Sequence, residues 1–206
     1  DYKDYLIRQL EKNDSITVRT GIEAAPEALK AEGYDAVILA LGSEPKTPPV
    51  PGAETLSRPW KPIEVYGREA ELGKRIVIVG GSETGTETGM YLAECGHEVT
   101  VLTRQEMLAK ESNNVHYYAL VQRRWEANPN FTGITEAETL SVSDGAVVYR
   151  DAQGEHRIEC DDIILSGGVR SLDKEALAFA GCARQVLCAG DCVKPGGIYN
   201  CNRTAL

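Results

Sequence analysis

An apolar run that breaks directly into glycines constrains the fold of this chain more than any other feature. Residues 76–79 are all apolar, Gly80 and Gly81 follow, and a helix-prone segment leads to a second apolar stretch at residues 99–102. A strand, a glycine turn, a helix and a second strand in this order form the βαβ unit that binds dinucleotides in Rossmann folds. The sequence therefore predicts a nucleotide site within residues 75–89. The alternative is a tight turn that holds no ligand.

Each glycine of this turn has an expected role. Gly80 permits the tight turn, Gly85 lets the helix approach the strand closely, and the helix N-terminus offers unpaired amides to a pyrophosphate. Ser82 replaces the middle glycine of the usual G-x-G-x-x-G pattern, and a serine hydroxyl is able to hydrogen-bond a phosphate. The residues predicted to hold the phosphates are Gly80, Gly81, Ser82, Glu83, Thr84 and Gly85.

The end of the second strand predicts the choice of cofactor. An acidic residue at this position grips the ribose hydroxyls of NAD(H), but here Thr103 and Arg104 follow the strand, with Lys110 further on. Guanidinium and ammonium groups pair strongly with a phosphate, so NADP(H) is favoured over NAD(H). Two alternatives stay open: the cations belong to a solvated helix start, or Glu106 serves the ribose of NAD(H).

Charge and hydropathy argue against two classes of partner. The 206 residues include 22 Lys and Arg against 31 Asp and Glu, a formal net charge of −9. This balance repels nucleic acid and anionic lipid, and no apolar run reaches the roughly 18 to 20 residues of a membrane helix. The N-terminus has no basic stretch leading into an apolar one. We therefore expect a soluble, cytoplasmic protein with no nucleic-acid or membrane partner.

The cysteines and histidines show no metal-binding pattern. There is no CxxC pair and no zinc-ligand spacing, so buried free thiols are expected, although crowding near the C-terminus leaves a redox or metal role open. The histidines lie in separate segments, which argues against a shared metal site. The residues concerned are Cys95, Cys160, Cys182, Cys188, Cys192, Cys201, His97, His116 and His156.

The first part of the chain alternates between helix and strand patterns, as in an α/β sheet. Residues 5–10 and 26–31 have helical character, and residues 15–19 alternate like a strand. The apolar run 35–41 stops at Gly42, as a parallel strand buried on both faces does.

The remaining segments complete the predicted fold. Residues 42–52 contain too much proline for a helix or a central strand, and residues 116–125 favour a helix. Residues 139–162 form three short alternating segments separated by Asp-Gly and Gln-Gly turns, which indicates an antiparallel meander. An apolar strand then ends in glycines, the second of which is Gly168.

Three segments resemble the pyridine nucleotide-disulfide oxidoreductase superfamily, flavoproteins with two dinucleotide-binding domains. The glycine run extended to residue 89 is similar to the family pattern G-x-G-x-x-G-x-E-x-A, and residues 34–52 resemble the strand, glycine turn and connector that leave the FAD domain. Residues 186–193 resemble the second FAD signature, in which the aspartate, here Asp191, contacts the ribityl or pyrophosphate region. The resemblance adds Gly42, Gly168, Gly190 and Asp191 to the expected cofactor-binding residues.

Within the superfamily, residues 190–200 resemble the C-terminal half of the NADH:flavin oxidoreductase group of enoate reductases, 2,4-dienoyl-CoA reductases and bile-acid desaturases. In that group NAD(P)H reduces FAD, and electrons pass through a 4Fe-4S cluster to FMN in a (β/α)8 barrel that reduces an enoate-type double bond. The resemblance implies FAD in the full-length protein, with FMN and the cluster in a part that this sequence lacks.

The resemblance also implies a domain organisation. The strand and first glycine motif that open the FAD domain of these proteins have no counterpart before Tyr5, so the chain is expected to be a fragment. Residues 67–170 are then a NAD(P)-binding domain of Rossmann type, three-layered, with a parallel sheet and a small antiparallel meander. Residues 1–66 and 171–206 are parts of an FAD-binding domain. The expected partners are the nucleotide and the rest of the parent chain, namely its FAD domain and a barrel domain.

One catalytic candidate and two alternative functions remain. Glu87 matches the glutamate of the family pattern on the nicotinamide side, and a helix-surface carboxylate is the alternative. The chain also fits a fragment of a thioredoxin-reductase or dihydrolipoamide-type disulfide reductase, whose CxxxxC motif would lie outside it. A non-catalytic NAD(P)-binding sensor module is the third possibility.

Overall fold

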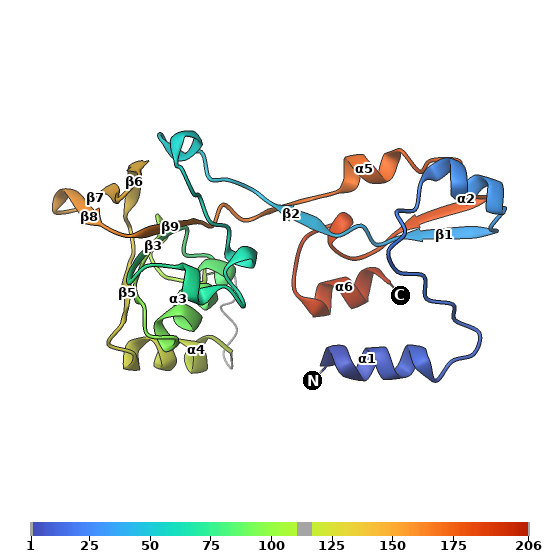
Figure 1. Cartoon of the computed structure of the whole chain (residues 1–206), viewed down its shortest axis with the longest axis horizontal. Coiled ribbons are helices and arrows are strands. Elements are labelled where there is room, and N and C mark those ends of the chain that lie inside the picture. Colours follow the sequence, from blue (N-terminus) through green and yellow to red (C-terminus); the bar gives the residue numbers. More distant parts are fainter. Residues whose placement is uncertain (1, 111–116, 206) are drawn as a thin grey trace. The chain divides into compact units, whose positions relative to one another are not determined.

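The computed structural model describes residues 2–110 and 117–205, which belong to two compact units (Figure 1). Unit 1 consists of Asp1–Leu41 and Leu172–Leu206, and unit 2 of Gly42–Ser171. The division falls where the proline-rich segment starts. The sequence assigns residues 42–66 to the FAD-binding domain, whereas in the structure they lie in unit 2, because this segment packs on the parallel sheet.

Unit 2 is built on a four-stranded sheet whose strands are all parallel, in the order β5-β4-β3-β9. β3 is apolar after its first residue and buried on both faces, as a central parallel strand requires. The elements are β3 (Arg75–Val79), α3 (Glu83–Glu94), β4 (Glu98–Leu102), α4 (Tyr117–Ala127), β5 (Phe131–Ile134) and β9 (Asp162–Leu165). The predicted βαβ unit is confirmed. The predicted helix around residues 116–125 is also present, although residue 116 lies outside the described part of the chain.

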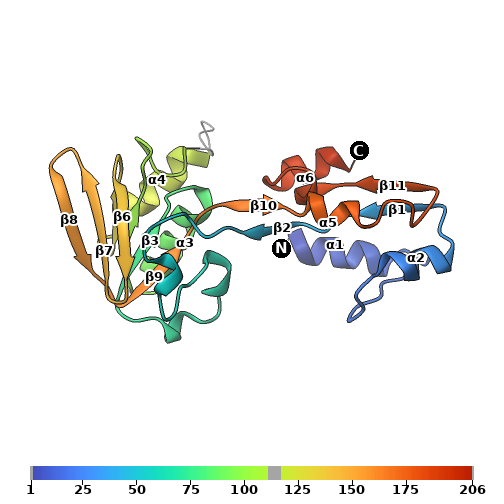
Figure 2. The same ribbon diagram turned by 90° about the horizontal axis from the view of Figure 1, so that it is seen from above.

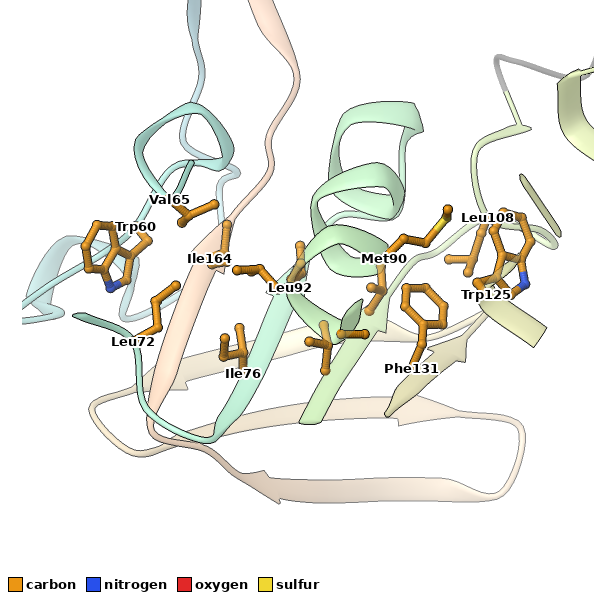
Figure 3. Close-up of a cluster of buried hydrophobic side chains, with 14 of the residues drawn as sticks. Trp60, Val65, Leu72, Ile76, Met90, Leu92, Leu108, Trp125, Phe131 and Ile164 are labelled. Carbon is orange, nitrogen blue, oxygen red and sulfur yellow. The ribbon is translucent and has the colours of Figure 1, made fainter. Parts of the chain in front are cut away.

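Successive residues of β3 face two hydrophobic cores. Ile76 and Ile78 pack with Met90 and Leu92 of α3, in the cluster shown in Figure 3. The alternate residues of the strand, Val77 and Val79, belong to a second cluster on the opposite face of the sheet. Burying each such side chain stabilises the fold by about 1.5 to 3 kcal/mol, so the apolar run of β3 holds two layers together.

The second core is closed by the predicted meander, which Figure 2 shows as neighbouring strands β6 (Glu138–Ser143), β7 (Ala146–Asp151) and β8 (Gly154–Glu159). The strands pair antiparallel. Both turn glycines have positive φ, 86° at Gly145 and 125° at Gly154, which explains why glycine marks these hairpins. With α3 and α4 over one face and the meander over the other, the predicted three-layer α/β fold is confirmed.

The segment before β3 is held to the sheet through Trp60. Its backbone forms a parallel bridge to Ile164 in β9, and its Nε1 donates to Asp162 at 2.9 Å. The guanidiniums of Arg58 and Arg68 lie 4.2 and 4.7 Å from the centroid of the indole ring. This segment contains three short 3-10 helices, η1 (Ala53–Thr55), η2 (Pro62–Glu64) and η3 (Glu69–Glu71).

The first and last strands of unit 2 along the chain pair as a two-stranded antiparallel ribbon. It pairs β2 (Ser43–Pro45) with β10 (Val169–Ser171), and Arg170 Nε donates to Glu44 at 2.6 Å. Pro45 ends β2, and the next residue, Lys46, donates its amide to the Gly168 carbonyl at 2.9 Å.

Unit 1 has a small parallel sheet in which β1 (Ala36–Leu39) pairs with β11 (Gln185–Cys188). The strand predicted at residues 15–19 is wrong: these residues form no strand, and Ile16 and Val18 are 43% and 62% exposed. An alternating pattern gives a strand only where a neighbour accepts its backbone bonds. The other elements are α1 (Tyr2–Glu11), α2 (Pro26–Glu32), α5 (Asp173–Leu177), η5 (Gly190–Cys192) and α6 (Ile198–Thr204).

Among the described residues, no helix has the length and the apolar character needed to span a bilayer.

Candidate functional site

The strand order of unit 2 reverses at β3, since the chain adds β4 and β5 on one side of β3 and β9 on the other. In open parallel sheets, ligands bind in the crevice beyond the carboxyl ends of the strands at such a switch point. A cavity of about 400 Å³ lies there, within the range of known ligand sites. Its lining includes Gly80, Gly81 and Ser82 after β3, Thr103, Arg104 and Gln105 after β4, and Ser166, Gly167 and Gly168 after β9.

The glycines of the first turn are required by contact distances. Gly80 has φ 114°, and a Cβ there would lie 2.1 Å from the carbonyl oxygen of Ser166. A Cβ on Gly85 would lie 1.9 Å from the carbonyl oxygen of Gly80. These distances agree with the expected roles of Gly80 in the tight turn and of Gly85 in the close approach of helix and strand.

Ser82 is the N-cap residue of α3 and leaves polar groups unpaired at the cavity. Its side chain makes no capping bond, and its Oγ is buried without a hydrogen-bond partner among the described residues. The first intrahelical bond runs from the amide of Thr86 to the carbonyl of Ser82 at 2.9 Å, so the amides of residues 83–85 have no acceptor within the helix. A buried hydroxyl and free amides at the positive end of a helix fit a pyrophosphate.

Glu83 and Thr84, which were predicted to hold phosphate, are exposed on the first turn of α3 and do not line the cavity.

Of the residues predicted to select the cofactor after β4, two line the cavity and one does not. Thr103 is 6% exposed, and Arg104 is exposed at the cavity. Lys110 does not line the cavity: its Nζ lies 3.0 Å from the carboxylate of Glu106, and this pairing lowers the pKa of Glu106. The structure therefore brings Thr103 and Arg104 to the site and leaves Lys110 outside its lining.

Several cavity residues were missed by sequence reasoning. Gln105 follows Arg104, residues 137–139 come from the start of the meander, and residues 48–50 come from the proline-rich segment. The position of Gln105 directly after a strand of the βαβ unit was a usable signal. Residues 137–139 carry no local signal, because they reach the site through backbone bonds such as Ala137 N to Thr103 O at 2.9 Å.

The remaining expected cofactor residues lie in different places. Gly168 has φ 78° and lines the cavity, whereas Gly42, with φ 82°, begins unit 2. Gly190 and Asp191 lie in η5 of unit 1. The Asp191 Oδ1 accepts bonds from the amide of Gly196 at 3.1 Å and from the thiol of Cys201 at 3.2 Å.

Glu87 is exposed on α3 and does not line the cavity. Partial burial of its carboxyl raises the pKa of Glu87, and the neighbouring Glu83 raises it further. The structure thus shows a perturbed carboxylate on the helix without placing it at the nucleotide cavity.

No cluster of three or more histidine, cysteine, aspartate or glutamate residues suited to a metal ion occurs in the described part of the chain. The Nδ1 of His97 donates to the Gly73 carbonyl at 2.8 Å, and the Nε2 of His156 lies 2.8 Å from the Asp151 carboxylate. His116 lies outside the described residues.

The fold and this cavity define a Rossmann-type nucleotide-binding unit. The chain belongs to the pyridine nucleotide-disulphide oxidoreductase family, whose model matches residues 7–194. Members of this family are NAD(P)H-dependent flavoprotein oxidoreductases, so the predicted superfamily and enzyme class are confirmed.

Individual relatives agree with this assignment. A bilirubin reductase from Mediterraneibacter gnavus is 30% identical over 192 residues, which are 91% of this chain and 29% of that protein. A cinnamate reductase from Clostridium sporogenes is 31% identical over 111 residues, or 51% of this chain and 16% of that protein. The solved structure of a 2-naphthoyl-CoA reductase superimposes with a TM-score of 0.86 at 26% identity, covering 96% of this chain and 30% of the other. This chain thus spans less than a third of each of these relatives.

Proposed function

We propose that unit 2 binds NAD(P)H in the switch-point cavity and orients it for hydride transfer to FAD within a longer parent protein. One observation carries the proposal: the buried Ser82 hydroxyl, which has no partner among the described residues, lines the cavity directly before the first turn of α3, whose amides at residues 83–85 have no acceptor within the helix. When bound, nicotinamide and flavin supply the hydride chemistry themselves, and the protein supplies binding and orientation.

The residues of this chain have distinct roles in the proposal. The glycine turn allows the pyrophosphate to approach the backbone, and Ser82 donates a hydrogen bond to it. Gly167 and Gly168 end β9 at the opposite wall, where a Cβ on Gly167 would lie 2.4 Å from the Lys46 carbonyl. Segment 46–48 thus passes directly over the end of β9, and it shields one side of the cavity from water.

NADP(H) is the cofactor that we propose for this cavity. Arg104 is exposed at the cavity directly after β4, and Thr103 replaces the acidic residue that would repel a 2′-phosphate. Lys110 has no part in this proposal, because its ammonium group is paired with Glu106 outside the lining.

We propose that the parent protein supplies the flavin site and reduces an enoate-type double bond. Relatives named as cinnamate reductase and 2-naphthoyl-CoA reductase support this reaction class. In unit 1, Asp191 is the residue that fits a flavin contact, but its carboxylate already accepts two bonds and the sheet beside it has two strands. FAD, FMN and the 4Fe-4S cluster are therefore proposed only for the parent protein.

Fluorescence titration of this chain with NADPH and NADH tests the nucleotide proposal. We expect tighter binding of NADPH, and we expect Arg104→Ala to weaken NADPH binding about tenfold or more while leaving NADH unchanged, because a charge-assisted bond to phosphate is lost. Lys110→Ala is the matched control, an exposed cation outside the cavity, and should change neither affinity. A wild-type preference for NADH would contradict the assignment of Arg104.

Reduction of an added flavin or dye by NADPH in the parent protein tests the catalytic part of the proposal. Electron transfer supports an oxidoreductase, and tight binding without any electron transfer would instead support a sensor module.

A further inference from the structure

Two thiols of unit 1 lie together at the end of the β1–β11 sheet. Cys188 is the last residue of β11 and is exposed, whereas Cys192, in η5, is 1% exposed. The Cys192 thiol lies 3.1 Å from the carbonyl oxygen of Ala189, the residue that follows Cys188, and 3.2 Å from that of Leu39, which pairs with Cys188 across the sheet. The turn between β11 and η5 thus brings the Cys192 thiol back to the backbone around Cys188.

The other cysteines have different surroundings. Cys160 is 3% exposed and so is inaccessible to a small disulfide, and burial raises its pKa to about 11. Cys182 is also buried, and Cys201 donates to the Asp191 carboxylate. Cys95 is exposed but lies in unit 2. Cys188 and Cys192 are therefore the pair that combines an accessible thiol with a buried thiol held beside it.

We propose that Cys188 and Cys192 form a redox-active dithiol that closes reversibly to a disulfide by exchange with a low-molecular-weight disulfide. The exposed Cys188 thiolate attacks the small disulfide, forms a mixed disulfide and releases one thiol. Cys192 then loses its proton, attacks the Cys188 sulfur and releases the second thiol. The two cysteines give up two electrons and two protons, and the small disulfide is reduced to two thiols.

Closure has a structural consequence at the sheet end. In the reduced state the Cys192 thiol lies 3.2 Å from the Leu39 carbonyl and so links η5 to the end of β1. A disulfide removes the thiol proton, and with it this bond and the bond to Ala189. The loop that follows, in which the Gly196 amide bonds to Asp191, then loses part of its support.

The rate of closure should depend on pH. Burial raises the pKa of Cys188, and the neighbouring Cys192 raises it further. Because the thiolate is the attacking species, exchange should accelerate as the pH rises through and above the ordinary thiol range.

Disulfide mapping after incubation of the reduced chain with oxidised glutathione tests the proposal. Free thiols are alkylated, the chain is digested, and tandem mass spectrometry assigns the linked residues. We expect a Cys188–Cys192 disulfide that dithiothreitol reverses. A chain that stops at glutathione on Cys188, or that links either residue to Cys201 instead, would overturn the proposal.

Three variants separate the roles of the thiols. Cys192→Ser should stop at the mixed disulfide on Cys188, Cys188→Ser should leave Cys192 unmodified, and the control Cys201→Ser should still form the Cys188–Cys192 bond.

Amide hydrogen exchange supplies a second readout: oxidation should speed exchange in residues 189–196 of the wild type and leave Cys188→Ser unchanged. Equal exchange in oxidised and reduced wild type would contradict the loss of the Cys192 bonds.

Discussion

At the scale of single residues, the glycine turn between β3 and α3 depends on positions where no side chain fits. The Gly85 backbone lies against the Gly80 carbonyl, and Gly81 faces Leu108 and Thr103, where a Cβ would approach to 2.7 and 2.9 Å. Neighbouring backbone cannot move as a flexible side chain does. The glycines therefore set how closely the first turn of α3 approaches β3.

Gly85→Ala should destabilise the chain by about 1 to 3 kcal/mol, because the added methyl group must push α3 away from the Gly80 carbonyl. Urea unfolding measures the change. Thr84→Ala, at an exposed position of the same helix turn, is the control and should have little effect. Equal stability of the Gly85→Ala variant and the wild type would show that the helix approach is less tight than the structure indicates.

Glu87→Gln should stabilise the chain near neutral pH. Burial and Glu83 raise the pKa of Glu87 in the folded state, so the folded chain binds this proton more tightly than the unfolded chain. The carboxylate thus costs stability as the pH rises from the ordinary glutamate range through the raised folded pKa, and the cost persists above it. Urea midpoints of the two proteins should coincide at acid pH and diverge above this window. A wild type more stable than Glu87→Gln at pH 7 would contradict the sign.

At the scale of elements, the parts predicted from sequence are those with local causes. The apolar run of β3, the glycine turn and the α3 pattern are adjacent in the chain, and the meander is marked by its turn glycines. The strand predicted at residues 15–19 was wrong because no neighbour pairs with it. Packing between distant segments brings residues 137–139 and Gln105 to the cavity, and it leaves Lys110 outside the cavity lining. Local sequence patterns do not carry this information.

The segment before β3 is held by a group of charged side chains around Trp60. The Glu71 carboxylate binds Arg58 at 2.5 Å and Arg68 at 2.8 Å, and both guanidiniums stack on the indole. These bonds lower the pKa of Glu71 to about 2, well below the usual range of a glutamate, with Arg68 the larger cause.

Glu71→Gln should therefore lower the stability of the chain only above acid pH. A depressed folded pKa contributes stability that is present above the unfolded value and is lost as the pH falls toward about 2. Urea unfolding across this range should show the wild type and the variant converging as the pH falls. A difference that stays constant down to pH 2 would contradict a role for the Glu71 charge.

At the scale of the whole molecule, the two units differ in how much apolar surface they bury. Both hydrophobic cores belong to unit 2. In unit 1, Ile38 of β1 is 66% exposed and Leu187 of β11 is 54% exposed, so the small sheet leaves apolar side chains in water. This difference supports the proposal that unit 1 is completed by other parts of a longer protein.

Amide hydrogen exchange should therefore be slowest in β3, β4 and β9 and much faster in β1 and β11. Segments with few buried apolar contacts open at low free energy, whereas central core strands exchange only through global unfolding. Equal protection of β1 and β3 would contradict the difference in burial between the units.

The central claim is that a nicotinamide dinucleotide binds at the carboxyl ends of the unit 2 strands. Backbone amide NMR spectra of the chain, recorded during titration with NADPH, test it most directly. The account predicts shifts concentrated at residues 80–82, 103–105, 137–139 and 166–168, which line the cavity, and at residues 83–85 of the adjoining helix turn. Absence of shifts at millimolar NADPH, or shifts confined to other segments, would contradict it.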